Sequence, residues 1–283
     1  MQFEIVTIFP GFFASIMENG IMHRALAEGL MTVGTHDLRE FTHDRHRTVD
    51  DRPFGGGEGM VLKPEPLAEA FASMGIEPKA ARQALEPGES GGTPARRTRV
   101  ILLSAQGRPF TQAVARELVT LDRVVLVCGR YEGVDERINQ LYCDMELSIG
   151  DYVISGGELA AAVVVDAVMR LIPGVLGNEA SSEFESFGVA DAEIDTDIEG
   201  VPRSQHGAGG LLDYPHYTRP AEFGGLRTPE VLMNGDHSQI RRWRREQQLR
   251  KTLANRPDLL QDAALSKEDR KLLEAIRREE SCS

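Results

Sequence analysis

VVLVCGRYEGVDERINQLYCDMELSIGDYVISGGELAAAVVVDAVMRLIP, residues 124–173, contains two short apolar runs rich in β-branched residues. These runs, Val124–Cys128 and Met145–Ile149, each lead directly into a loop that contains glycine. Runs of this length and composition predict buried strands of a parallel sheet. In an open α/β sheet, ligands bind in the crevice beyond the carboxyl ends of such strands. The sequence therefore predicts a small-molecule pocket between the loops Gly129–Gly133 and Gly150–Gly157.

A helix is expected after the second loop, from Glu158 to about Leu171. Ser155 and Glu158 have the three-residue spacing of a capping box, and Pro173 ends the pattern. Because the segment is apolar nearly all round, it is predicted to be a core helix. Asp166 inside it is interpreted as a satisfied buried carboxylate rather than a catalyst.

The pattern of strand, loop and helix recurs earlier in the chain. Further strands are predicted at Phe3–Ile8, Val33–Leu38 and Arg99–Leu103, and further helices at Phe12–Gly29, Pro64–Met74 and Thr111–Leu121. Arg99–Leu103 leads into the loop Ser104–Gly107, which resembles the two later loops in its position after a strand. This alternation predicts an α/β fold with a mainly parallel sheet.

Composition divides the 283 residues into three parts. Residues 1–177 form the predicted α/β domain, with a surface insertion at 76–98 that is rich in Pro, Gly and charge. Residues 178–210 are acidic and contain several glycines, which predicts a flexible interdomain linker. Residues 211–283 show helical patterns and predict a small all-α C-terminal domain.

The formal net charge of −12 argues against indiscriminate binding to nucleic acid. One predicted helix, Ser238–Leu253, nevertheless combines a buried face of Ile240, Trp243, Leu249 and Leu253 with the cations Arg241, Arg242, Arg244, Arg245, Arg250 and Lys251. A charge run is usually a solvated helix face. So many cations on one helix of an acidic chain favour a phosphate-contacting surface instead.

Membrane and secretory classes are not favoured by the sequence. No apolar run approaches the length of a membrane span, and the first residues predict a strand rather than a signal peptide. The cysteines Cys128, Cys143 and Cys282 form neither a CxxC pair nor an even framework, so a cytoplasmic protein with reduced thiols is expected.

The polar segment 40–60 contains His43 and His46 near Asp44 and Asp50. As a metal site this ligand set is incomplete, so an exposed polar loop is the favoured interpretation and no metal site is predicted. The glycines at 55–59 are not a P-loop, because no Gly-Lys-Ser/Thr follows. They permit close backbone approaches that other residues would block.

Together these motifs resemble one family, the bacterial tRNA (guanine-N1)-methyltransferases that modify the guanine beside the anticodon. The similarity covers most of the chain apart from the two insertions and the extreme C-terminus. The matching stretches are Ile8–Pro10, His43–Met60, Leu103–Gly107, Cys128–Arg137, Ser148–Glu158, Asp213–Pro220 and Ile240–Arg244.

The resemblance implies properties that the residue patterns alone do not give. It implies a C-terminal deep trefoil knot in the α/β domain, an exception to the usual absence of knots. It also implies S-adenosylmethionine as cofactor and a homodimer with active sites between the subunits. The implied substrate is a tRNA with guanine at position 37 following guanine at position 36.

Carried over by position, the resemblance places cofactor contacts in the predicted pocket loops. They are Gly129, Ile149, Gly150, Asp151, Tyr152, Val153 and Ile154, with Ser104 and Gly107 bordering the same pocket. Backbone groups of such loops can bind the adenine edge without long side chains. Glu132 matches a position near the methyl donor where Mg²⁺ is implicated; the alternative is an ion pair with Arg130 or Arg137.

Methylation at guanine N1 requires removal of its proton, and a carboxylate within hydrogen-bond reach can accept it. The family assigns this role to the aspartate of an Asp-Ser-Phe triplet, whereas this chain has Glu185-Ser186-Phe187. Glutamate keeps the carboxylate but adds a methylene. Asp213 is the competing candidate, although its Asp-Tyr-Pro context favours a structural role. Arg170 matches the family's arginine that supports the target guanine, against the alternative of a cation snorkelling from an apolar helix.

Two other functions stay open at this point. The same scaffold can serve a knotted methyltransferase that acts on another RNA position, since fold does not fix function. A non-catalytic RNA-binding protein that keeps the cofactor pocket is the second alternative. Cofactor-dependent methylation, and the position of the methylated base, distinguish the three.

Overall fold

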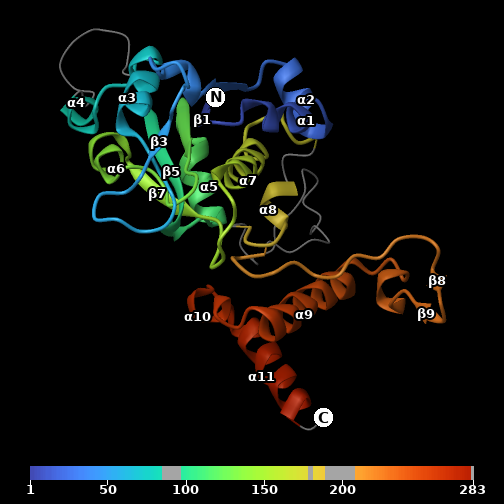
Figure 1. The fold of residues 1–283 in the computed structure, drawn as a ribbon. Coiled ribbons are helices and arrows are strands. Elements are labelled where there is room, and N and C mark those ends of the chain that lie inside the picture. Colours follow the sequence, from blue (N-terminus) through green and yellow to red (C-terminus); the bar gives the residue numbers. More distant parts are fainter. Residues whose placement is uncertain (85–96, 178–180, 189–207, 282–283) are drawn as a thin grey trace. The chain divides into compact units, whose positions relative to one another are not determined.

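The computed structural model describes residues 1–84, 97–177, 181–188 and 208–281 (Figure 1). The chain divides into two units, Met1–Gly177 and Asn178–Ser283.

The first unit is organised around a five-stranded parallel sheet with the strand order β2-β1-β6-β5-β7. Its strands are β1 (Gln2–Thr7), β2 (Thr32–Asp37), β5 (Thr98–Pro109), β6 (Arg123–Cys128) and β7 (Met145–Ser148). Every strand predicted from an apolar run is present, and the predicted α/β class with a parallel sheet is confirmed.

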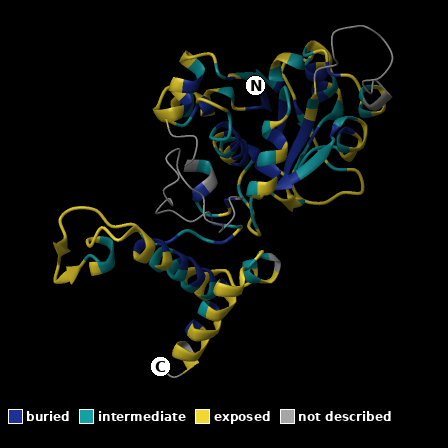
Figure 2. Cartoon of the chain, turned by 180° about the vertical axis from the view of Figure 1, so that it is seen from behind, coloured by how far each residue is buried: buried dark blue, intermediate teal, exposed yellow. Residues whose placement is uncertain are grey.

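Both faces of the sheet are buried, which explains why its strands have near-continuous apolar sequences. On β6, Val124 and Leu126 belong to one core cluster, whereas Val125 and Val127 belong to the other. The first cluster, on one face, includes residues of η1 (Pro10–Phe13), α2 (Gly20–Ala27), α5 (Gln112–Val119) and α7 (Gly157–Met169). The second cluster, on the other face, includes residues of η2 (Leu38–Phe41), α3 (Pro64–Ser73) and α6 (Glu136–Tyr142). Figure 2 shows the buried residues concentrated on the strands and on the inner sides of these helices.

The prediction of one helix over Phe12–Gly29 is wrong. The segment forms the end of η1, then α1 (Ala14–Met17) and α2, with a break before Gly20. Gly20 has φ +63°, a backbone conformation that interrupts a right-handed helix and that glycine adopts readily.

The surface insertion predicted at 76–98 is partly wrong. Ile76 is buried, and α4 (Lys79–Ala84) follows it. Arg82 of α4 pairs with Asp144 over 2.7 Å, and its side chain also bonds backbone carbonyl groups. These contacts attach the first part of the segment to the sheet domain, and β5 already begins at Thr98. Residues 85–96 lie outside the described residues.

The second unit is mainly helical but not all-α. It contains α8 (Ser181–Phe184), η3 (Glu230–Leu232), α9 (His237–Asn255), α10 (Leu259–Asp262) and α11 (Lys267–Ser281). It also contains a hairpin of β8 (Glu222–Phe223) and β9 (Leu226–Arg227), which corrects the all-α prediction. The predicted linker 178–210 contains α8, while its residues 178–180 and 189–207 lie outside the described part of the chain.

The basic helix is present as α9, and its predicted apolar face includes the buried Ile240 and Leu249. Its cations are less available to phosphate than predicted. Arg245 is 3% exposed and pairs with Asp269 of α11 over 2.7 Å, and Arg241 is also buried. Arg250 bonds both Glu246 and Glu279, so the exposed cations of this set are Arg242 and Lys251. Some of the cations of α9 therefore stabilise the second unit through ion pairs instead of being available to bind phosphate.

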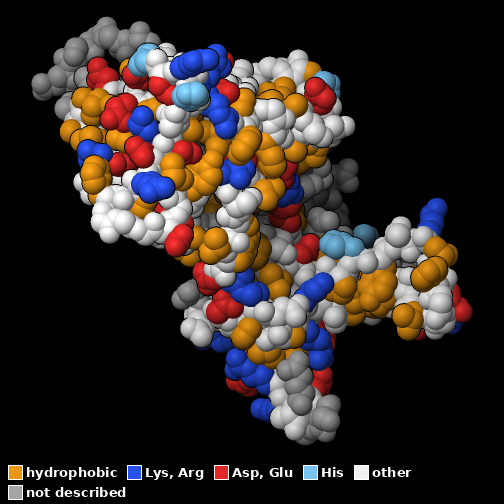
Figure 3. Space-filling view, in the orientation of Figure 1, with side chains coloured by type: hydrophobic (Ala, Val, Ile, Leu, Met, Phe, Trp, Pro, Cys, Tyr) orange, Lys and Arg blue, Asp and Glu red, His pale blue; other side chains and the backbone are white. Residues whose placement is uncertain are grey.

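No helix in the described residues is long and apolar enough to cross a membrane. On the face of the first unit seen in Figure 3, basic and acidic side chains are interspersed rather than gathered by sign.

A buried charge cluster joins three strands of the sheet. Glu4 on β1 lies between His36 on β2, with Nε2 2.6 Å from Oε2, and Arg123 on β6, at 3.3 Å. Burial by itself raises the pKa of Glu4, but the hydrogen bond and charge of His36 and the charge of Arg123 outweigh it and hold the pKa below its usual value.

We expect Glu4→Gln to reduce the pH dependence of stability. A lowered pKa in the folded state means that Glu4 stabilises the protein above the unfolded pKa, and that this contribution is lost as the pH falls through the folded pKa. Urea unfolding at neutral pH and at a series of acidic pH values measures it. The difference in unfolding free energy between wild type and variant should shrink in acid; a constant difference would contradict the assignment.

Candidate active site

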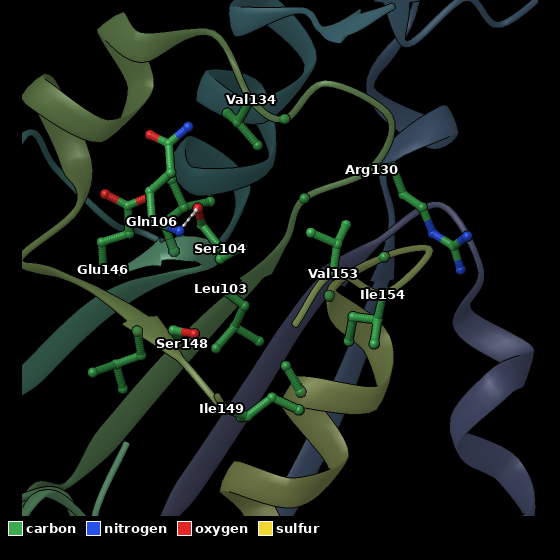
Figure 4. Close-up of a pocket in the computed structure, with 18 of the residues that line it drawn as sticks. Leu103, Ser104, Gln106, Arg130, Val134, Glu146, Ser148, Ile149, Val153 and Ile154 are labelled. Atoms are coloured by element: carbon green, nitrogen blue, oxygen red, sulfur yellow. Dashed lines mark hydrogen bonds between the residues drawn. The ribbon is translucent and has the colours of Figure 1, made fainter. Parts of the chain in front are cut away.

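A cavity of about 320 Å³ lies beyond the carboxyl ends of β5, β6 and β7 (Figure 4). Its walls come mainly from Leu102–Gln106, Gly129–Val134, Glu146–Gly150 and Tyr152–Gly157. The volume falls at the lower end of the range for small-molecule and cofactor sites. The pocket is thus at the sheet edge where the sequence predicted it.

Most of the residues predicted to bind a cofactor are brought together here. The lining includes Ser104, Gly129, Glu132, Ile149, Gly150, Tyr152, Val153 and Ile154. Gly107 and Asp151 do not line the cavity. Gly107 packs against β7, where an added Cβ would lie 2.5 Å from the Leu147 nitrogen. Its role is therefore to allow the close approach of two backbones.

The segment Ser104–Gly107, predicted as a loop, is a bulge within strand β5. Leu103 and Arg108 both pair with Leu147 of β7, so the residues between them bulge out of the ladder. The Ser104 hydroxyl accepts a hydrogen bond from the Gln106 N–H at 3.0 Å, which holds the bulge (Figure 4). The bulge begins where β5 stops pairing with β6, at the carboxyl end of that strand, and brings Ser104 and Gln106 to the cavity.

The loop after β6 contains a tight turn. The Gly133 N–H donates to the Arg130 carbonyl oxygen over 2.9 Å, with Tyr131 at φ +57° and Gly133 at φ +120°. The chain returns to this turn after β7, because the Gly157 N–H donates to the Gly129 carbonyl oxygen at 2.9 Å. An added Cβ on Gly157 would lie 2.7 Å from Cys128 Cα, so the approach requires glycine.

The loop after β7 forms the opposite wall. Ser148 Oγ donates to the Gly150 carbonyl oxygen at 3.0 Å, and Gly150 has φ +150°. Beyond it, Tyr152 and Val153 are 55% and 88% exposed. Figure 4 shows Ile149, Val153 and Ile154 on one side of the cavity and Gln106, Glu146 and Val134 on the other. One side of the cavity is therefore apolar, whereas the other carries the polar groups of Gln106 and Glu146 beside Val134.

A buried ion pair holds the two loops together. Glu158, 1% exposed, accepts from Arg130 Nε at 3.0 Å and from the Thr7 hydroxyl at 2.8 Å. Arg130 also donates to the Ser155 carbonyl oxygen, and its guanidinium lies 4.6 Å from the centre of the Phe9 ring. The predicted capping box is therefore wrong: Gly156 is the N-cap residue, without a side-chain cap, and the Glu158 carboxylate serves the ion pair instead.

Helix α7 is less completely buried than predicted. Val164, Val165 and Val168 are in the core, but Leu159 and Val163 are 50% and 46% exposed. Asp166 is exposed on the same helix, which corrects its interpretation as a buried carboxylate. Arg170 is the C-cap residue of α7 and is half-buried.

Glu132 is exposed at the pocket wall and does not form the ion pairs considered for it. Arg130 pairs with Glu158, and Arg137 pairs with Asp135. Glu146, which the sequence analysis missed, also lines the pocket, and its carboxylate accepts from Asn139 at 3.4 Å. The signal was present, because Glu146 is a charged residue inside the apolar run Met145–Ile149.

Glu185 and Asp213, the two candidate bases, lie in the second unit. The Asp213 N–H donates to the Ser186 hydroxyl at 2.9 Å, and the Phe187 N–H donates to the Leu211 carbonyl oxygen at 2.8 Å. The two segments therefore run side by side. The Asp213 carboxylate accepts from its neighbour Tyr214 N–H and contacts His216 Nε2 at 3.0 Å, so it is occupied by local structure.

Other candidate chemistry in the described residues is limited. Burial and the nearby Glu158 carboxylate raise the pKa of the Cys128 thiol, so it stays protonated. Burial also raises the pKa of Cys143 to about 12. His43 pairs with Glu69 at 2.8 Å, and no group of three or more His, Cys, Asp or Glu that could hold a metal occurs among these residues.

A parallel sheet with a pocket at its carboxyl edge, walled by glycine-bearing loops, is the setting in which α/β proteins bind a small organic cofactor or substrate. The sequence profile of the family described as tRNA (Guanine-1)-methyltransferase TrmD matches residues 1–262. The chain belongs to this family of tRNA methyltransferases.

Individual members of the family are similar in sequence to this chain over nearly their full lengths. A tRNA (guanine-N(1)-)-methyltransferase of Koribacter versatilis is 54% identical over 277 residues, covering 98% of both chains. The enzymes of the same name from Dehalococcoides mccartyi and Geotalea uraniireducens are 47% and 46% identical, over 99% and 98% of both chains. Together with the family match, these similarities identify the chain as an enzyme of this class.

We expect Glu158→Gln to destabilise the first unit by about 2–4 kcal/mol, because it leaves the Arg130 guanidinium poorly compensated in a largely buried site. Urea unfolding measures the change. Glu117→Gln is the matched control, since its ion pair with Arg108 is about half exposed and should contribute about 1 kcal/mol or less. Equal losses in the two variants would refute a structural role for the Arg130–Glu158 pair.

Proposed function

We propose that the protein transfers a methyl group from S-adenosylmethionine to N1 of guanine 37 in tRNAs with guanine at position 36. The observation that carries this proposal is the family match over residues 1–262, which includes every segment that walls the pocket. A tRNA substrate places the reaction in the cytoplasm.

S-adenosylmethionine is proposed to bind in the cavity beyond β5, β6 and β7, as expected for methyltransferases of this family. The residues present fit such a group: the apolar side chains of Ile149 and Ile154 can cover an adenine ring, and the loop backbones offer polar groups at its edge. When bound, the cofactor supplies an electrophilic methyl group on a sulfonium. Gly107 and Asp151 do not line the pocket.

Glu185 is proposed to take the proton from guanine N1. Its backbone lies in a turn, closed by the Gly188 N–H donating to the Glu185 carbonyl oxygen at 2.9 Å, and the following Ser186 is bonded to the Asp213 backbone. Asp213 is proposed to hold this turn through its backbone N–H, which donates to the Ser186 hydroxyl, while its carboxylate bonds the Tyr214 N–H and contacts His216. A carboxylate base near neutral pH removes the obstacle to attack by N1.

Arg170 is proposed to support the target guanine, where a cation near O6 stabilises the charge that develops on the base. Its position at the C-terminal end of α7 gives it a rigid backbone. Glu132, an exposed carboxylate at the pocket wall, is proposed to attract the cationic cofactor. No step is assigned to Mg²⁺: Glu132, Glu136 and Glu146 line the pocket, but no group of three or more His, Cys, Asp or Glu that could hold a metal ion occurs among the described residues.

A homodimer with active sites between subunits is part of the proposal. The exposed Leu159 and Val163 on α7, and Val153 at the pocket rim, provide apolar side chains that a second subunit would cover. Within the first unit, the chain crosses from the edge strand β7 back to the end of β6, as shown by the Gly157–Gly129 hydrogen bond. We propose that this crossing forms the trefoil knot expected for the family.

The second unit is proposed to bind the tRNA. Its available cations on α9 are Arg242 and Lys251, with Arg244 beside the Tyr214 ring. The alternatives, methylation of another RNA position and RNA binding without catalysis, have no observation in their favour.

The function is tested by transfer of a labelled methyl group from S-adenosylmethionine to unmodified tRNA transcripts that carry guanine or adenine at position 37. We expect label on N1 of guanine 37 alone, located by mass spectrometry of the digested product. Label on another base would replace the proposed substrate, and the absence of label with the cofactor bound would favour the non-catalytic alternative.

Glu185→Gln should lower kcat by about 10²–10⁴-fold, because the amide cannot accept the N1 proton. Affinity for the cofactor, measured by calorimetry, should stay at the wild-type value. Asp213→Asn serves as the matched variant and should have the smaller effect on kcat. Wild-type turnover in the Glu185 variant would transfer the base role to Asp213.

A further inference from the structure

The hairpin loop 52–60 is a feature that the proposed function leaves without a role. It connects β3 (Asp50–Asp51) to β4 (Val61–Leu62), which pair antiparallel. The Lys63 N–H donates to the Val49 carbonyl oxygen at 2.8 Å and closes the base of the hairpin. Both ends of the loop are therefore fixed, and its tip projects from an ordered base.

Phe54 lies at the tip of this loop with its side chain 99% exposed. The Gly56 N–H donates to the Pro53 carbonyl oxygen at 3.3 Å, so Phe54 is a central residue of a turn. Gly55, Gly56 and Gly57 all have positive φ, between +78° and +123°. An aromatic ring in this position contributes no burial to the fold, so its whole surface is available to a ligand.

The C-terminal end of the loop is hydrogen-bonded to the wall of the cofactor pocket. The Glu132 N–H donates to the Met60 carbonyl oxygen, and the Leu62 N–H donates to the Gly133 carbonyl oxygen, both at 3.0 Å. An added Cβ on Gly59 would lie 2.4 Å from a Glu132 carboxylate oxygen. Because Glu132 and Gly133 line the cavity, the loop and the pocket wall share one backbone network.

The charges around the loop do not indicate a phosphate-binding role for it. Between residues 43 and 59, Arg45, Arg47 and Arg52 are balanced by Asp44, Asp50, Asp51 and Glu58. A segment without a positive excess is a poor phosphate site. An exposed ring on a loop whose C-terminal end bonds the pocket wall is instead suited to stacking on a base, which is how proteins bind unpaired nucleotides.

We propose that Phe54 stacks on an unpaired base of the tRNA next to the target guanine and thereby positions that guanine at the pocket. This inference rests on the proposed function, since it takes a tRNA loop as the substrate. The glycines beside Phe54 have no side chains, so a nucleobase can approach the ring from that side.

The test is equilibrium binding of unmodified tRNA to the full-length protein, its Phe54→Ala variant and its Phe54→Tyr variant. Phe54→Ala should weaken binding by about tenfold, the effect of losing one stacked base, and by the same factor at low and high salt. Phe54→Tyr should bind as the wild type does. Affinity for S-adenosylmethionine, measured by calorimetry, should be equal in all three proteins.

A double-mutant cycle locates the partner base. Transcripts with an abasic site at position 36 or 38 are bound to wild type and to Phe54→Ala, and at one of these positions the two losses should not add. Phe12→Ala, which truncates another exposed ring of the first unit, is the control and should leave tRNA affinity unchanged.

Unchanged tRNA affinity in Phe54→Ala, or additive losses at both positions, would overturn the proposal. Dissociation of a dimer by Phe54→Ala, detected by light scattering, would assign the ring to a contact with a second copy and would also overturn it. Because these are binding measurements, they stay interpretable if wild type fails to methylate guanine 37, so the two proposals fail separately.

Discussion

The ion pair between Arg130 and Glu158 connects the parts on which the pocket depends. Arg130 belongs to the turn after β6, and Glu158 belongs to the start of α7. Glu158 also accepts a hydrogen bond from Thr7 at the end of β1, and Arg130 also donates to the Ser155 carbonyl oxygen. The pair is largely withdrawn from water, so its attraction is strong and its rupture costly. Phe9 stacks on the outer face of the Arg130 guanidinium and adds a segment from the first loop of the chain. Segments far apart in sequence are thereby fixed at one edge of the sheet.

Backbone contacts complete what the ion pair begins. Gly107 and Gly157 allow one strand or loop to lie against the backbone of another at distances that a Cβ would prevent. The return of the chain from β7 to the end of β6 relies on the second of these approaches. The pocket walls are thus set mainly by backbone geometry, and side chains such as Glu146 and Gln106 add polar groups to one wall.

The strands and the place of the pocket were predictable, because residues buried on both faces of a sheet leave apolar runs that sequence alone displays. Where the structure differs from the sequence-based predictions, the difference has a specific physical cause. Ser155 and Glu158 have the spacing of a capping box, but the carboxylate has a stronger partner in Arg130, which lies 28 residues earlier in the chain. Arg245 was assigned to a phosphate surface because its partner Asp269 comes from a later helix. Helical periodicity over Phe12–Gly29 does not register the positive φ of Gly20. Each failure concerns a long-range partner or a backbone conformation, neither of which composition reveals.

The strand order has a consequence for the protein while it is being synthesised. β1 pairs with β2, the next strand along the chain, but its other neighbour is β6, so Gln2 cannot form its second pairing until Arg123 has been synthesised. Until then the nascent chain carries an apolar strand with one unpaired edge, which is a template for aggregation. Parallel pairing at such separation is also slow, because loop closure precedes any gain from contact. The sheet that supports the pocket is thus most prone to aggregation before its central strand, β6, leaves the ribosome.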